Sequence, residues 1–383
     1  MTYVFAALIV SFMVTLIVIR IQLAGAHAPR NTAVVRRARR LHEQGLQSFG
    51  RAGGIGVAAG LLASLCARLF DDAPYASASA QLGLTLLASA IPVFGAGLIE
   101  DFTQRVGMEL RLIAALVSAA LAGWLLGVWV VRIDVPILDG IVALPLVSML
   151  FTCLVVAGLT HAFNIIDGFN GLAAGVASLI LLGIAYVAFK VGDVMIVAAA
   201  LTALGAIAGF MLLNFPRGLV FLGDSGAYLI GYWIGMLLVL LVARNPSISA
   251  WFPVLLCAYP VCELLFSIYR RGIVRGTHPG RPDLAHLHHL IYKRLVRWLA
   301  GTGMPAHGIQ RNSLTAPYLW ILTSVGVAPA IVFWHATPVL QVGSALFAVA
   351  YVYAYARIVR FRAPRWWVLR KPGKRQADAS GPG

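Results

Sequence analysis

The chain is organised around one polar stretch, His161-Ala162-Phe163-Asn164-Ile165-Ile166-Asp167-Gly168-Phe169-Asn170-Gly171-Leu172. It separates two long apolar runs, 141–159 and 172–189. Asn and Asp form hydrogen bonds with their own backbone and Gly adopts positive φ, so all three favour turns over helix interiors. The stretch therefore predicts a loop or a helix break at the end of a membrane-spanning segment. Residues 163–171 are called the Asn-Asp loop below.

A simple reversal of the chain is the alternative interpretation of this loop. Such a turn needs only two or three residues of this kind. The loop instead contains Asn164, Asp167 and Asn170 at three-residue spacing, beside two glycines. This density of polar residues favours a binding or catalytic site.

Composition identifies the class of protein. The 383 residues are 60% hydrophobic and 11% charged, whereas soluble proteins contain about 25% charged residues. Apolar runs of about 20 residues, the length that crosses a bilayer, recur through the chain and lack the alternation of a membrane β-barrel. The sequence predicts an all-α, polytopic integral membrane protein. We expect about eleven transmembrane helices, at approximately 2–23, 53–70, 80–99, 112–131, 141–162, 172–190, 193–213, 225–243, 250–268, 316–335 and 338–356.

The basic residues are distributed unevenly between the connections. Arg and Lys cluster mainly after the first, third, seventh and ninth predicted spans and in the tail. The positive-inside rule then places the N-terminus outside and the C-terminus in the cytoplasm. This distribution accounts for most of the net charge of +16, so we expect no nucleic-acid partner. The four cysteines lie within apolar runs without disulfide or zinc spacing and are interpreted as packing residues.

We expect a single transmembrane catalytic domain over residues 1–361, followed by a basic cytoplasmic tail over 362–383. Its cytoplasmic active-site loops are predicted at about 24–52, 100–111, 163–171, 214–224 and 269–315.

Three further polar clusters fall on the same predicted side as the Asn-Asp loop. The first contains Glu100 and Asp101, adjacent carboxylates at the end of a predicted helix. Such a pair either binds a divalent cation or raises one pKa by mutual repulsion, and a solvated helix end is the alternative. The second, Gly223–Gly226, opens a predicted helix, where Asp224 suits Mg²⁺ and the backbone N–H groups suit a phosphate. A helix N-cap is its alternative.

The third cluster lies in the ninth connection and contains Asp283, His286, His288 and His289. Its spacing fits no common zinc site, and contacts to phosphate are favoured. Glu263 is the one acid well inside a predicted span, which makes it a candidate functional group. A structural ion pair with Arg270 or Arg271 is the favoured interpretation of this carboxylate.

With these motifs in place, the chain resembles the polyprenyl-phosphate N-acetylhexosamine-1-phosphate transferase superfamily, the integral-membrane MraY/WecA group. The resemblance extends from Leu41-His42 and Arg51-Ala52-Gly53-Gly54 to the histidine cluster. Its specific signal is the combination of Asn-x-x-Asp-Gly-x-Asn-Gly with Gly-Asp-Ser-Gly and Pro-Asp-x-x-His-x-His-His. Eleven spans and the histidine pattern are more similar to the WecA branch than to the peptidoglycan-precursor branch.

The resemblance implies transfer of a sugar-1-phosphate, by default from UDP-GlcNAc, to undecaprenyl phosphate with release of UMP. This reaction would initiate a lipid-linked surface glycan such as O-antigen, at the bacterial inner membrane. The implied cofactor is Mg²⁺, with Mn²⁺ as a substitute. The implied partners are a UDP-amino sugar, polyprenyl phosphate and membrane lipids, and homodimerisation stays open.

Residue roles follow from the same resemblance. Asp224 would hold Mg²⁺, with Asn164 as its partner. The implied catalytic carboxylates are Glu100, Asp101 and Asp167. The implied substrate-binding residues are Asn170, Asp283, His286, His288, His289, Arg105 and Arg111. Two departures stand out: the family's Asp-Asp pair is Glu-Asp here, and its Pro-Thr-Pro is replaced by Ser48-Phe49-Gly50.

The sequence and the implied substrates also allow predictions about the reaction mechanism. A phosphate acceptor is largely ionised near neutral pH because its second pKa is about 6. We therefore expect direct attack by the lipid phosphate, with Asp101 positioning groups or acting as base, and a two-step route through an aspartyl phosphate is the alternative. Transfer of phospho-MurNAc-pentapeptide is the alternative reaction. Membrane transport is the alternative class, which polar groups confined to one face disfavour.

Overall fold

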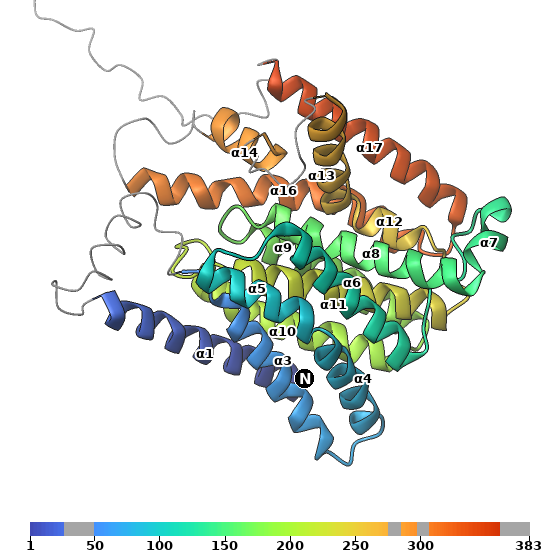
Figure 1. The fold of residues 1–383 in the computed structure, drawn as a ribbon, viewed down its shortest axis with the longest axis horizontal. Coiled ribbons are helices and arrows are strands. Elements are labelled where there is room, and N and C mark those ends of the chain that lie inside the picture. Colours follow the sequence, from blue (N-terminus) through green and yellow to red (C-terminus); the bar gives the residue numbers. More distant parts are fainter. Residues whose placement is uncertain (27–49, 275–284, 297–305, 361–383) are drawn as a thin grey trace, which may run out of the picture.

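The computed structural model describes residues 1–26, 50–274, 285–296 and 306–360, and every regular element in these ranges is helical. Figure 1 shows long helices running side by side across the molecule. The helices are α1 (Thr2–Ala26), α3 (Gly53–Leu69), α4 (Ala76–Ser89), α5 (Ile91–Thr103), α6 (Met108–Leu126), α7 (Pro136–Val142), α8 (Pro145–Ile166), α9 (Leu172–Lys190), α10 (Val194–Asn214), α11 (Gly223–Arg244), α12 (Phe252–Leu256), α13 (Ala258–Tyr269), the π-helical segment η1 (Arg270–Val274), α14 (Leu287–Ile291), the π-helical segment η2 (Tyr292–Val296), α16 (Ala306–Val332) and α17 (Thr337–Val359). The predicted tail, 362–383, lies outside the described residues.

The all-α, multi-pass membrane fold predicted from the sequence is confirmed. Within the described ranges, eight helices are long and apolar enough to cross a membrane, and the bent pair α4–α5 raises the number to nine. Each of the eleven predicted ranges contains helix, but α3 has only 17 residues and the ninth range is divided into α12 and α13. The count of eleven spans and the orientation of the termini stay predictions.

Proline and irregular backbone explain where the predicted helix boundaries were wrong. The range 80–99 is two helices bent by 50°, with Pro92 in the first turn of α5. Proline lacks an N–H and suits a first turn but not a helix interior. The range 141–162 begins instead at Pro145, and α7 forms a separate short helix in the connection before it.

Helix α11 is the central element of the bundle. Of the 18 consecutive residues that form its most apolar stretch, 89% are buried inside the protein. This burial is possible because apolar residues cover the whole circumference of the helix. It packs against α8, α5, α3 and α9, and Figure 1 shows it in the middle of the bundle. Its N-terminus carries the Gly-Asp-Ser-Gly motif, so the core of the protein leads directly into the polar clusters.

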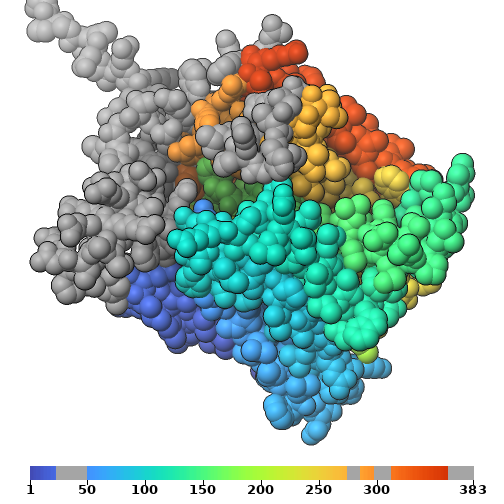
Figure 2. All heavy atoms as spheres, in the orientation of Figure 1, coloured from blue at the N-terminus to red at the C-terminus, as the bar shows by residue number. Residues whose placement is uncertain are grey.

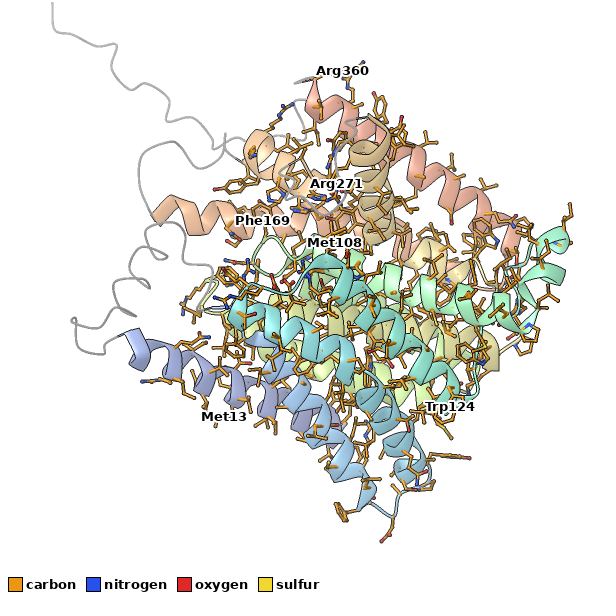
Figure 3. The ribbon with its side chains drawn as sticks, in the orientation of Figure 1. Met13, Met108, Trp124, Phe169, Arg271 and Arg360 are labelled. Atoms are coloured by element: carbon orange, nitrogen blue, oxygen red, sulfur yellow. The ribbon has the colours of Figure 1, made fainter. Side chains whose placement is uncertain are left out.

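The connections alternate between the two ends of the bundle. Those that follow α1, α5, α8, α10 and α13 contact one another at one end, which we call the polar end. The contacts include Gly53 N to Phe221 O, Asp224 N to Asp101 Oδ1 and Asn170 Nδ2 to Pro216 O. Figure 3 shows Met108 and Phe169 towards this end and Trp124 towards the opposite one. This alternation brings together the clusters that the sequence placed on one side of the membrane.

At the opposite end, Asp134 fastens three connections together. Its carboxylate accepts hydrogen bonds from Arg132, from the Ala250 amide at 2.7 Å and from the hydroxyls of Ser249 and Thr337. Burial opposes ionisation of this carboxyl, but the Ala250 amide and the Arg132 guanidinium outweigh it and hold the pKa of Asp134 below its ordinary value.

Asp134→Ala is expected to lower the free energy of unfolding by about 2–3 kcal/mol, because several donors lose one shared acceptor. Thermal unfolding in detergent measures the change. Asp72→Ala, an exposed carboxylate at the same end, is the control and is expected to leave the melting temperature unchanged. Equal melting temperatures for the two variants would contradict the fastening role of Asp134.

Candidate active site

The N-terminus of α11 is held by the carboxylate of Asp101. This side chain, 3% exposed at the end of α5, accepts from the amides of Asp224 at 2.8 Å and Ser225 at 2.9 Å. It also accepts from the Ser225 hydroxyl at 2.6 Å. A carboxylate satisfies the unpaired amides at a helix N-terminus and complements its dipole. Asp101 thereby fixes where Asp224 lies.

Asp224 faces Arg111 from α6. Its Oδ2 lies 2.5 Å from a terminal nitrogen of the guanidinium, and the two side chains are 15% and 20% exposed. Tyr228, one turn along α11, and Glu100 lie within electrostatic range of Arg111. The Arg111 Nε is buried and has no hydrogen-bond partner. The charge of Asp224 is thus directed into the site, and the cap of this helix start comes from Asp101 rather than from Asp224 itself.

Asp167 lies directly after the last residue of α8 and completes a group of three acids. Burial, followed by the negative charges of Asp224 and Asp101, raises the pKa of Asp167 to about 8, and the positive charge of Arg51 partly offsets this. The Gly223 amide also donates a hydrogen bond to Asp167, which places this carboxylate at the start of α11, beside Asp224 in the chain. The loops after α5, α8 and α10 therefore concentrate negative charge at the polar end.

The Asn-Asp loop is held in place by asparagines from outside it. Asn312 Oδ1 accepts from the Asn170 amide at 2.8 Å, and Asn214 Oδ1 accepts from the Gly171 amide at 2.6 Å. Trp320 in α16 donates from Nε1 to the Gly171 carbonyl. The Asn170 side chain donates to Pro216, while its own Oδ1 is buried without a partner. Asn170 therefore anchors the loop and leaves one acceptor unused.

Two glycines permit the close approach of backbone at the site. Gly223 has φ +78°, and a Cβ there would lie 2.2 Å from the Arg51 carbonyl oxygen. A Cβ on Gly54 would lie 2.4 Å from the Gly226 amide nitrogen. The Arg-x-Gly-Gly and Gly-Asp-Ser-Gly motifs are thus packed against each other, which only residues without a side chain allow.

The histidine cluster lies against the Asn-Asp loop. His286 and His288 are buried, with parallel rings 5.3 Å apart. His288 Nε2 lies 3.0 Å from where a Cβ on Gly168 would be, and the Phe169 ring is 5.7 Å from the His288 ring. Burial, followed by the charges of His289 and His286, holds the pKa of His288 well below its ordinary value. His288 is therefore neutral and offers a hydrogen bond rather than a positive charge.

The prediction that Glu263 forms an ion pair with Arg270 or Arg271 is wrong. The Glu263 carboxylate contacts His286 Nδ1 at 3.0 Å, the Leu287 amide at 2.9 Å and the Tyr351 hydroxyl at 2.8 Å. Arg270 instead donates to the Ala285 carbonyl and to the Tyr355 hydroxyl. The α13 helix turns Glu263 towards α14 and α17, which proximity in sequence does not reveal.

The remaining predicted residues are more dispersed. Glu100 accepts from the Val106 amide at 2.8 Å and closes the loop after α5, and Arg105 is exposed on that loop. Asn164 lies in the last turn of α8, and its side chain forms no hydrogen bond with the described residues. Its pairing with Asp224 stays a prediction. His289 contacts Phe169 with rings 5.6 Å apart, and Asp283 lies outside the described residues.

Three residues near the acids were not among the predicted site residues. Arg51 lies beside Asp167, and its signal was the Arg-x-Gly-Gly motif. Tyr228 lies beside Arg111, and His161 contacts Tyr228 edge-to-face at 5.2 Å with a buried, unpartnered Nε2. His161 begins the polar stretch and could have been included from its position alone.

The arrangement defines a multi-pass helical membrane protein with a charged site at one end of the bundle. In Figure 2 the green surface around the end of α8 is set back between the teal α5–α6 region and the orange α14 region. Carboxylates, a guanidinium, imidazoles and unpartnered buried polar atoms converge there. Such a site suits a charged ligand that reaches the protein at a membrane surface.

Comparisons with known proteins agree with this class. The family model described as glycosyl transferase family 4 matches residues 83–242. A Bacillus subtilis protein named "Probable undecaprenyl-phosphate N-acetylglucosaminyl 1-phosphate transferase" is 34% identical over 139 residues, which is 36% of this chain and 38% of the relative. The Thermotoga maritima undecaprenyl-phosphate alpha-N-acetylglucosaminyl 1-phosphate transferase is 28% identical over 55% of this chain and 62% of its own length.

The Mycobacterium tuberculosis decaprenyl-phosphate N-acetylglucosaminephosphotransferase is 30% identical over 292 residues, which is 67% of this chain and 65% of the relative. The chain thus spans 38% to 65% of the length of these three relatives. With the motif combination, these matches support the similarity of this chain to the polyprenyl-phosphate N-acetylhexosamine-1-phosphate transferase superfamily. The resemblance stated from the sequence is confirmed at this level.

Proposed function

We propose that this chain transfers a sugar-1-phosphate, in the first instance N-acetylglucosamine-1-phosphate, from a UDP-sugar to undecaprenyl phosphate and releases UMP. The reaction would take place at the cytoplasmic face of a bacterial inner membrane and initiate a lipid-linked glycan such as O-antigen. One observation carries the proposal: Asp101, Arg111, Asp167 and Asp224 converge at one end of a membrane bundle. The names of the three relatives support the substrate classes.

The acid cluster fits the proposed Mg²⁺. Asp167 is destabilised as an anion first by burial and then by the charges of Asp224 and Asp101, and a divalent cation would offset both effects. Within the described ranges, no three His, Cys, Asp or Glu side chains form a complete cation site. Mg²⁺ is typically bound by one or two carboxylates together with waters and substrate phosphates. Asp224 and Asp167 are the residues that would hold it, with Asn164 as a further ligand; when bound, Mg²⁺ would neutralise diphosphate charge.

The charged side chains suit phosphoryl transfer. The lipid phosphate is already largely ionised because its second pKa is about 6, so alignment and charge neutralisation matter more than deprotonation. Arg111 and Arg51 lie beside the acids and would bind phosphate oxygens, as guanidinium groups do through paired N–H donors. His288 and His289 lie against Gly168 and Phe169 of the Asn-Asp loop.

Asp101 is proposed to be a positioning residue rather than a base. Its two oxygens accept three hydrogen bonds from Asp224 and Ser225 at the start of α11, which occupy most of its lone pairs. This geometry supports direct attack by the lipid phosphate on the sugar-bearing phosphorus. A labelled enzyme trapped from UDP-sugar alone would contradict the direct route.

Membranes that contain the protein provide the test of function. With Mg²⁺, undecaprenyl phosphate and a panel of UDP-amino sugars, we expect equimolar UMP and a sugar-diphosphate lipid, and chelation of the metal should stop both. The panel includes UDP-MurNAc-pentapeptide, which tests the peptidoglycan reaction directly. Absence of UMP with every amino sugar would contradict the proposal. Release of sugar into sealed vesicles without UMP would favour transport.

A further inference from the structure

Glu263 is a buried carboxylate in a membrane helix whose partners lie in a different part of the fold. It is 1% exposed, and its oxygens contact His286 Nδ1, the Leu287 amide and the Tyr351 hydroxyl. An intramembrane carboxylate is costly unless it is hydrogen-bonded. The three contacts join α13 and α17 to the beginning of α14, where the histidines lie. Glu263 is therefore built into the support of the histidine cluster.

The contact with Nδ1 determines what His286 can offer to a ligand. A carboxylate beside Nδ1 keeps a proton on that nitrogen and leaves Nε2 for the ligand. Within the described ranges, His286 Nε2 forms no hydrogen bond. When the ring is protonated on both nitrogens, Nδ1 donates to Glu263 and Nε2 is a second donor. His286 can then donate from Nε2 to an anionic oxygen.

His288 differs from His286 in this respect. It is 1% exposed, and its Nδ1 is buried without a partner. Its own ring is neutral, as its lowered pKa indicates. Of these two stacked histidines, only His286 contacts a carboxylate. His286 is therefore the better hydrogen-bond donor to a phosphate.

The histidine stack connects Glu263 to the Asn-Asp loop. His286 lies parallel to His288, with an angle of 3° between the rings. His288 in turn lies against Gly168 and Phe169. A change at Glu263 would thus reach the loop through His286 and His288, without any direct contact between the carboxylate and a substrate.

We propose that Glu263 is a positioning residue for phosphoryl transfer, holding His286 so that its Nε2 donates to a phosphate oxygen of the nucleotide-sugar diphosphate. The identity of that phosphate rests on the proposed function. Charge on the departing UMP phosphate grows as the bond to phosphorus breaks, so a donor there acts mainly on kcat. Tyr351 and the Leu287 amide complete the hydrogen bonds of the carboxylate.

Glu263→Gln tests the role of the charge in an activity assay. The amide oxygen can still accept from Nδ1 but carries no charge, so the hydrogen bond that fixes the ring is weaker. We therefore expect kcat to fall about 10- to 100-fold and KM to change by less than about 3-fold. Tyr259→Phe is the matched control. Tyr259 lies in the same helix as Glu263, and its hydroxyl is buried without a hydrogen-bond partner, so kcat should change by less than about 3-fold. Unchanged kcat in Glu263→Gln would overturn the proposal.

A double-mutant cycle separates positioning from a general structural effect. If Glu263 acts through His286, then Glu263→Gln should change kcat by less than about 2-fold when His286 is already alanine. Losses that multiply in the double variant would show that Glu263 acts independently of His286 and would overturn the proposal.

The tautomer provides a readout that needs no activity. In ¹⁵N-histidine NMR of the full-length protein, with the signal assigned through His286→Gln, we expect a protonated Nδ1 on His286, alone in the neutral ring and together with a protonated Nε2 when the ring donates to phosphate. Glu263→Gln should retain this signal and Glu263→Leu should lose it. A wild-type His286 protonated on Nε2 alone would overturn the proposal. Because this result is independent of UMP release, failure of the proposed function and failure of the Glu263 role are distinguishable.

Discussion

Replacement of Asp224 by asparagine should reduce UMP release by at least about 10³-fold while the protein still folds and inserts into membranes. Asparagine has the same size but no charge. It cannot form an ion pair with Arg111, whose guanidinium nitrogen lies 2.5 Å from the carboxylate. It is also a weaker ligand for a divalent cation. The position is in the first turn of α11 with its side chain directed into the site, so the helix core is not disturbed. The measurement is UMP release from membranes at saturating UDP-sugar.

Asp72→Asn is the matched control, because it removes the same charge from an exposed position at the opposite end of the bundle. Its rate should equal that of the wild type. Expression and the melting temperature in detergent should be the same for both variants. Wild-type rates for Asp224→Asn would refute the role of this carboxylate in charge neutralisation.

Replacement of Gly97 by alanine should impair both stability and activity. A Cβ at this position would lie 2.7 Å from the Cα and the backbone nitrogen of Ser225. Backbone atoms cannot rotate away as a side chain can, so α5 and α11 must separate. Overpacking of this kind costs about 1–3 kcal/mol. Because Asp101 and Asp224 lie at this contact, the displacement should also lower kcat about 100-fold.

The same helix contains a control for this experiment. Gly95 lies two residues earlier, and a Cβ there meets nothing within 4 Å. Gly95→Ala should leave activity unchanged and slightly raise the melting temperature, because alanine favours a helix by up to about 1 kcal/mol. Melting temperatures and kcat are compared for the two variants side by side. If Gly97→Ala behaves like Gly95→Ala, the close approach of α5 to α11 is not required for function.

Much of the candidate site was visible in the sequence because its residues occur in compact motifs. Gly, Asp and Asn in short runs between apolar segments are poor helix formers, so their position between spans followed from composition. The charge distribution then placed the clusters on one side, and the hydrogen bonds between Asp101, Asp224 and Ser225 show that two of them meet. Arg51 was missed as a site residue because a basic residue near a membrane helix is usually an orientation signal.

The roles of individual polar groups were harder to predict from the sequence. Asp101 was expected to be either a base or a positioning group, and the amides that occupy its oxygens belong to a helix 123 residues further along. Glu263 was assigned to the nearest arginines in sequence, whereas its partners are 23 and 88 residues away. Hydrogen bonds between helices depend on which face each helix presents, and the period of an apolar span does not reveal this when the span is apolar all round.

The sequence by itself determined that this protein is an all-helical membrane protein, that its polar motifs lie between spans and that their combination marks one superfamily. These properties depend on local composition, because a bilayer selects long apolar helices and excludes polar loops. Only the tertiary structure decided which motifs contact one another. Packing of α5 and α8 against α11 buries Asp167 and adds the negative charges of Asp224 and Asp101, and in that order these raise the pKa of Asp167 to about 8. The Asn-Asp loop thus acquires its charge environment from residues distant in sequence, through the close approach of helices at glycines.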